Sequence, residues 1–112
     1  MCIKLDLLLP VAVHLYYYLL GTLGTYYKVG MKNGRPKYRK RGRWGIPTMI
    51  LWHGHTAWRV GIKDYLWHGS KHPLLWRRSS GYCPNTNSGG SWWVNHNAWH
   101  MDRTLNVFCI DR

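Results

Sequence analysis

The stretch KNGRPKYR, residues 32–39, decides the fold class. Asn33-Gly34 is the strongest short signal for a β-hairpin, because both residues tolerate the positive φ angles of a two-residue type I′ turn. Pro36 then restricts Arg35 to an extended conformation. The residues before the turn, 25–31, are rich in strand formers, and residues 37–43 are expected to form the return strand. The sequence therefore predicts a hairpin at this turn.

Positive side chains occupy every odd position from 35 to 43. Because side chains alternate across a strand, one face of the return strand would be entirely cationic. Most charge runs on strands are solvated edges that resist aggregation, but five cations on one face favour anion binding. We therefore predict a ligand-binding edge in which aromatic side chains accompany the cations. Its predicted members are Lys28, Arg35, Lys37, Tyr38, Arg39, Arg41, Arg43, Trp44 and Trp58.

The composition supports an anionic partner. The 112 residues, enough for one domain, carry 16 Lys and Arg against four acids, a formal net charge of +12. Such a charge repels itself unless anions are close. Eight Trp and eight Tyr either replace aliphatic residues in the core or form a binding surface. Polyanions, glycans, nucleic acids, membrane surfaces and acidic proteins all remain open as partners, as does a larger assembly.

Alternating apolar residues continue after the hairpin. Residues 48–52 and 56–62 are expected to be strands joined by the turn-like His53-Gly54-His55, and Trp58 lies on the apolar face of the second strand. Residues 64–90 contain several Gly and Pro, which favours loops with short strands. Residues 91–94 and 104–110 are expected to be the final strands. The chain is therefore predicted to be mainly β: a small antiparallel sheet or barrel-like module of hairpins with an apolar N-terminal segment.

The first 24 residues differ from the remainder. An apolar run follows Lys4 and ends in small residues near Gly24, which resembles a degenerate secretory signal. Residues 1–24 are therefore predicted to be a signal or membrane-directing segment, and residues 25–112 a basic, aromatic-rich β module. The alternatives are a buried helix or strand of the domain, or a lipid-facing anchor. Secretion or a cell-surface location is expected, with an organelle as the alternative.

The cysteines fit an oxidising compartment. Cleavage near Gly24 would remove Cys2 and leave Cys83 and Cys109. A disulfide between them would close a loop of about 27 residues and stabilise a small domain by roughly 3–4 kcal/mol. We predict this disulfide, with two buried thiols as the alternative.

Several short motifs together resemble a class of uncharacterised extracellular β-rich modules with the pattern N-G-R-P-x-Y … W-x-[VI]-G … C-P … W … C. The resemblance covers about residues 24–111 and implies a β fold and an extracellular setting, but no function. The heavy positive charge and the absence of Glu depart from the pattern. The motifs are Gly24-x-Tyr26, Asn33-Gly34-Arg35-Pro36-x-Tyr38, Leu51-Trp52, Trp58-Arg59-Val60-Gly61, Cys83-Pro84, Trp92-Trp93 and Val107-Phe108-Cys109.

Catalytic and metal-binding motifs are weak. The chain has no Glu, no G-x-S-x-G and no phosphate-binding glycine loop, so we predict that it is not an enzyme and needs no cofactor. His53 and His55 would face one way on a strand, but Pro73 argues against a helix under His68 and His72. No metal site is predicted, and these four histidines are the weak candidates for zinc or copper.

The function expected from the residues is that of a secreted, non-enzymatic binding or structural surface module. Its cations would hold the sulfate or carboxylate groups of a glycan, and its aromatic faces would stack on sugars. The first alternative is RNA or single-stranded DNA binding by a ribosome-associated or organellar protein. The second is a cationic membrane-active protein.

Overall fold

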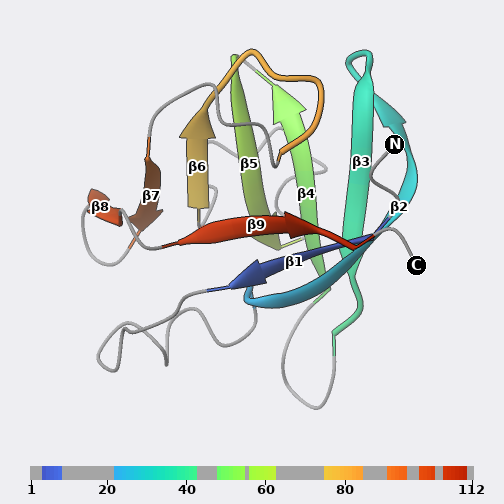
Figure 1. Cartoon of the computed structure of the whole chain (residues 1–112), viewed down its shortest axis with the longest axis horizontal. Helices are drawn as coiled ribbons and strands as arrows, with labels where there is room; N and C mark the ends of the chain where they lie inside the picture. Colours follow the sequence, from blue (N-terminus) through green and yellow to red (C-terminus); the bar gives the residue numbers. More distant parts are fainter. Residues whose placement is uncertain are drawn as a thin grey trace.

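The chain folds into one antiparallel sheet of nine strands (Figure 1). The structure is a computed structural model that describes residues 4–8, 22–42, 48–54, 56–62, 75–84, 91–95, 99–102 and 105–110. The prediction of a mainly β fold is confirmed. The strands are β1 (Lys4–Leu8), β2 (Gly24–Lys32), β3 (Arg35–Lys40), β4 (Met49–Gly54), β5 (Ala57–Ile62), β6 (Leu75–Arg78), β7 (Trp92–Asn95), β8 (Trp99–Asp102) and β9 (Asn106–Cys109).

The strand order requires the sheet to curl. Each strand from β1 to β8 pairs with the next, and β9 returns to pair with β1, so β8 and β9 lie at opposite ends of the order. Nine strands side by side would be about 38 Å wide. Only three residues connect Asp102 to Asn106, and such a connection spans at most about 14 Å. The two edges must therefore approach each other, which gives the half-barrel of Figure 1.

The core is built from the inner face of this sheet. Five side chains lie directly opposite one another across five neighbouring strands, and each is completely buried. Burying each contributes about 1.5–3 kcal/mol. A slip of one residue in any of these pairings would turn that strand's core side chains to solvent, so the row fixes the register. Its members are Tyr38, Leu51, Val60, Leu75 and Val94.

The N-terminal strand β1 belongs to the same core. It lies between β2 and β9, and Leu5 and Leu7 are completely buried. The Tyr26 hydroxyl, on the neighbouring strand, donates to the Thr22 carbonyl at 2.6 Å. Residues 4–8 thus form a strand of the domain, one of the alternatives for the N-terminal segment, whereas residues 9–21 lie outside the described residues. None of the described residues belongs to a helix long and apolar enough to cross a membrane.

The predicted hairpin is present. Asn33 and Gly34 have φ angles of 54° and 77°, as a type I′ turn requires. The return strand ends at Lys40, three residues earlier than predicted. The register shifts between Lys28 and Gly30, which makes Val29 the additional residue of a bulge in β2.

Three local expectations need correction. His53 and Gly54, predicted as part of a turn, are the last residues of β4, and the chain reverses after them at Thr56. β6 fits the short strands predicted for residues 64–90, but β8 is an additional strand between the two predicted final strands. Cys83 carries a free thiol, so the predicted Cys83–Cys109 disulfide is not formed. Cys109 is disulfide-bonded, but not to Cys83, and both cysteines are partly buried against the hydrophobic core.

Candidate functional site

The outer face of the β2–β3 hairpin carries the predicted cations. Along β3, Pro36 and Tyr38 are buried, while Lys37 and Arg39 alternate with them and point outward. The predicted alternation is therefore correct. Arg41, just after the strand, is exposed. Within the described part of the chain, no hydrogen bond or ion pair engages Lys37, Arg39 or Arg41, so these three positive charges are uncompensated.

An exposed tyrosine lies beside these cations. Tyr27 faces Arg39 across the β2–β3 pair and Lys4 across the β1–β2 pair. The Lys4 Nζ lies 5.4 Å from the centroid of the Tyr27 ring, a cation–π contact, and the Tyr27 side chain remains 53 % exposed. The row Lys4–Tyr27–Arg39 therefore presents an aromatic ring between two cations on the outer face.

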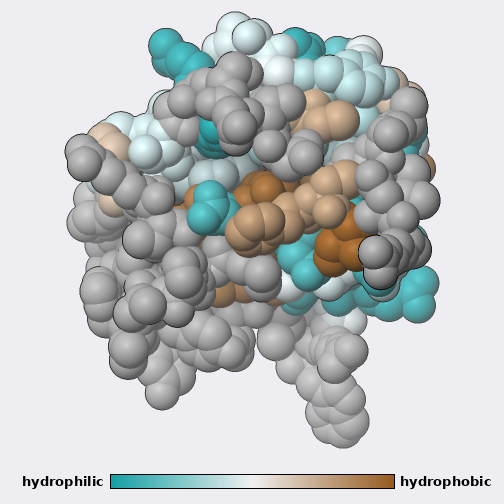
Figure 2. Space-filling model, viewed as in Figure 1, coloured by the Kyte–Doolittle hydropathy of each residue, from teal (hydrophilic) through white to brown (hydrophobic). Residues whose placement is uncertain are grey.

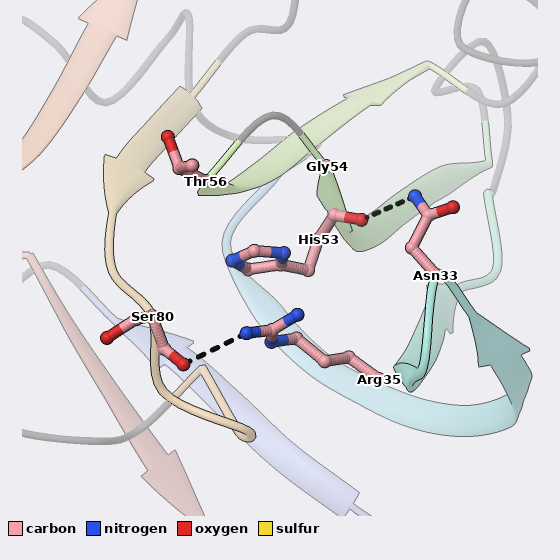
Figure 3. A pocket seen from close by; sticks show the side chains of 6 residues that line it. All are labelled: Asn33, Arg35, His53, Gly54, Thr56 and Ser80. Atoms are coloured by element: carbon pink, nitrogen blue, oxygen red, sulfur yellow. Dashed lines mark hydrogen bonds between the residues drawn. The ribbon is translucent and has the colours of Figure 1, made fainter.

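Arg35 has a different role from the other predicted cations. Its Nη2 donates to the Ser80 carbonyl at 3.0 Å (Figure 3). Its Nε donates to the Gly81 carbonyl at 3.1 Å. These bonds connect the hairpin to the segment 79–84, which follows β6. Arg77 adds a bond from Nη1 to the Pro84 carbonyl at 3.3 Å. Arg35 is thus first a structural tether, because charged donors on carbonyls are among the stronger hydrogen bonds.

His53 secures the beginning of the same segment. Its Nε2 lies 2.7 Å from the Ser79 carbonyl, which can only accept, so this nitrogen carries the proton. The Ser79 N–H donates to the Thr56 carbonyl at 3.1 Å. The imidazole also packs edge-on against Trp58, with ring centroids 5.2 Å apart. These contacts fix the imidazole in position.

The environment of His53 favours its neutral form. Burial lowers the pKa of the imidazole below the ordinary value of 6.5; the Ser79 carbonyl opposes this shift, and the charges of Arg35 and Arg59 add to it. The unfolded chain therefore binds a proton at His53 more readily than the folded chain. The stability that neutral His53 contributes should be present above pH 6.5 and should be lost as the pH falls through the lowered folded-state pKa.

We therefore expect His53→Gln, whose amide can still donate to the Ser79 carbonyl, to weaken the decrease in stability between pH 7 and pH 5. Urea unfolding of both proteins at each pH measures this. Parallel decreases in the two proteins would show that His53 does not control acid sensitivity.

A partly enclosed pocket of about 290 Å³ lies between the hairpin turn and the tethered segment (Figure 3). Its described lining includes a guanidinium, an imidazole, hydroxyls and an amide, and none of these residues is acidic. The Asn33 Nδ2 donates to the His53 carbonyl at 2.9 Å, which holds the turn against β4. The lining residues are Asn33, Arg35, His53, Gly54, Thr56 and Ser80.

Some predicted ligand contacts are not available at the surface. Tyr38 and Trp58 are completely buried in the core, so their prediction as ligand contacts is wrong: their aromatic faces pack inside the half-barrel. Lys28 lies opposite Tyr38 and is half-buried. Arg43 and Trp44 lie outside the described residues.

The histidine candidates give no metal centre in the described part of the chain. Of them, only His53 is described, because His55, His68 and His72 fall on residues that the structure does not describe. No group of three or more His, Cys, Asp or Glu side chains with the geometry to hold a metal ion occurs among the described residues.

A second aromatic group lies on the outer face of β6–β8. The rings of Trp76 and Trp93, which pair across β6 and β7, are stacked with centroids 5.9 Å apart. Trp99 packs edge-on against Trp76 at 6.1 Å and is 40 % exposed. These tryptophans were missed as site candidates. The alternation of Trp76 and Trp93 with the buried Leu75 and Val94 is the signal that could have placed them on the outer face.

A separate exposed apolar strip follows β9, where Phe108 is half-exposed (Figure 2). It lies on the edge strand opposite β8 in the strand order.

Comparison with known proteins gives no assignment: no family model, no curated protein and no solved structure matches the chain. The resemblance of the Asn33–Tyr38 motif to extracellular β-rich modules accordingly stays a prediction.

Proposed function

We propose that the chain is a non-enzymatic binding module whose hairpin contacts a polyanionic glycan. The observation that carries this proposal is the group of uncompensated cations Lys37, Arg39 and Arg41 on the outer side of the hairpin, beside the exposed ring of Tyr27. Guanidinium groups bind sulfate and carboxylate through paired hydrogen bonds. An aromatic ring beside them suits a ligand that has both charged groups and apolar ring faces, as a sulfated sugar does.

The outer tryptophans support a ligand that is a chain rather than a single small ion. Successive cross-strand pairs join Trp52 to Arg59, Arg59 to Trp76, Trp76 to Trp93 and Trp93 to Met101. This row crosses five strands and is therefore about 19 Å long. At its β8 end, half-buried and exposed indole faces are available for sugar rings. These tryptophans replace Tyr38 and Trp58 as the aromatic part of the proposed surface.

A glycan ligand fits a secreted or cell-surface protein, and we propose that location. RNA binding in an organelle predicts the same salt dependence but a different ligand preference, since base stacking would require single-stranded nucleic acid. The choice of probe therefore separates the two functions.

The test is retention on immobilised heparin by a variant carrying Lys37→Ser, Arg39→Ser and Arg41→Ser. We expect its affinity at 0.1 M salt to fall about 10- to 100-fold, and the slope of log K against log salt to fall by about 3, since each of the three ionic contacts contributes nearly one unit to that slope. Thermal unfolding of the variant should remain close to wild type, because the three side chains are outside the core.

A matched pair of single variants controls for net charge. Arg39→Ser and Arg78→Ser each remove one positive charge, but Arg78 is an exposed residue at the end of β6. Only Arg39→Ser should weaken heparin binding substantially. Equal effects, or none from the triple variant, would contradict the proposal. Tighter binding to single-stranded RNA than to heparin would overturn the glycan in favour of nucleic acid.

A further inference from the structure

The pocket beside the hairpin turn is separate from the outer cationic face. Its walls come from three parts of the chain: the turn with Arg35, the end of β4 with His53, and Ser80 after β6 (Figure 3). The bonds of Arg35 to the Ser80 and Gly81 carbonyls and of His53 to the Ser79 carbonyl hold these walls together. The cavity is therefore maintained by the fold.

The described lining of the pocket carries a positive charge and no acidic side chain. Arg35 uses one N–H of Nε and one of Nη2 on carbonyls, and its remaining N–H groups have no partner among the described residues. A guanidinium is always charged and presents five donors. Ser80, on the opposite wall, turns its carbonyl toward Arg35 and its hydroxyl away from the guanidinium (Figure 3). A fixed positive charge in a partly enclosed site attracts anions more strongly than the same charge in open water.

The pKa of His53 responds to the same positive charge. The charges of Arg35 and Arg59 both lower its pKa, while burial acts in the same direction and the Ser79 carbonyl acts against them. An anion beside Arg35 would offset the positive charges and raise the pKa of His53. The imidazole is therefore a built-in reporter of occupancy.

We infer that this pocket binds one sulfate group, which the remaining N–H groups of Arg35 hold by hydrogen bonds. A volume of about 290 Å³ is close to the lower end of the range for small-molecule sites, so it can admit part of the sugar that carries the sulfate. The identification of a sulfated sugar as the source of the sulfate group rests on the proposed function. The anion site itself does not depend on that function.

The test follows the His53 imidazole by NMR during titration with galactose 6-sulfate, galactose and sodium sulfate, with sodium chloride at matched ionic strength. We expect a saturable change and a raised pKa of His53 with both sulfate compounds, and neither effect with galactose or chloride. Tighter binding of galactose 6-sulfate identifies the sugar ester as the ligand, and tighter binding of free sulfate identifies the ion. No saturable change with either sulfate compound would overturn the inference.

Two variants separate this pocket from the outer face. Arg35→Lys keeps the positive charge but not the fork of N–H groups that the guanidinium presents, so we expect sulfate affinity to fall about tenfold. Arg39→Ser should leave the sulfate effect on His53 intact while weakening heparin binding. If Arg39→Ser abolished the effect of sulfate on His53, the sulfate site in the pocket would be refuted. If Arg39→Ser bound heparin as tightly as wild type, only the proposed function would be refuted.

Discussion

Deletion of residues 1–24 is expected to abolish cooperative folding of the remaining chain. The deletion removes β1, a strand paired on both sides, and with it the buried Leu5 and Leu7. These two side chains contribute about 3–6 kcal/mol by burial alone, and the ladders to β2 and β9 disappear with them. A small domain has only about 5–15 kcal/mol of stability in total. The sheet is therefore not expected to survive without this strand.

Thermal unfolding followed by circular dichroism, on residues 25–112 against the full chain, measures the effect. A chain of residues 4–112 is the control, because it retains all of β1 and should unfold as a single transition like the full chain. A stable, cooperatively unfolding 25–112 would show that β1 is dispensable. That result would restore the prediction that residues 1–24 are a removable leader.

Replacing Trp58 with alanine is expected to lower the free energy of unfolding by about 3–5 kcal/mol. The indole is completely buried on the inner face of β5 and packs against His53. Its removal leaves a cavity and takes away the support of the imidazole that holds Ser79. The indole Nε1–H has no hydrogen-bond partner among the described residues, so the substitution breaks no hydrogen bond there. The cost is therefore one of packing.

Trp99→Ala is the matched control, since it makes the same chemical change at a side chain that is 40 % exposed on the outer face. Urea unfolding of both variants should show a loss for Trp99→Ala of less than about 1 kcal/mol. Similar losses in the two variants would mean that the inner and outer faces of the sheet are assigned wrongly.

The hairpin could be predicted from the sequence because its cause is local. Only residues that tolerate positive φ fit a type I′ turn, and Asn33 and Gly34 adopt such angles. The alternation of Pro36 and Tyr38 with cations is equally local, since it follows from strand geometry. β4 and β5 were found for the same reason, within two residues at each end.

The strands that the sequence indicates poorly depend on the strands that they pair with. β1 resembles a leader in isolation, and its burial follows from pairing with β9. β6 and β8 have few β-branched residues and lie near Gly, Pro or Asn. Their strand conformation comes from the cross-strand pairs that they make, such as Trp76 with Trp93.

The candidate site could be predicted only in part. The sequence indicates which face of β3 is cationic, but it does not indicate that Arg35 reaches carbonyls 45 and 46 positions later in the chain. Arg35 can act as a tether only because the fold brings the segment 79–84 against the hairpin turn. In the same way, the burial of Trp58 and the exposure of Trp99 depend on how the sheet curls.

The pairing of β1 with β9 has a consequence for biosynthesis. Leu5 faces Cys109, so β1 leaves the ribosome about a hundred residues before β9, and both of its edges are covered only after β9 has been made. Contacts of such long sequence separation form late and slow folding. Until then the nascent chain exposes an apolar strand edge, which is prone to aggregation. Chaperone capture of this edge during synthesis would protect the chain until β9 arrives.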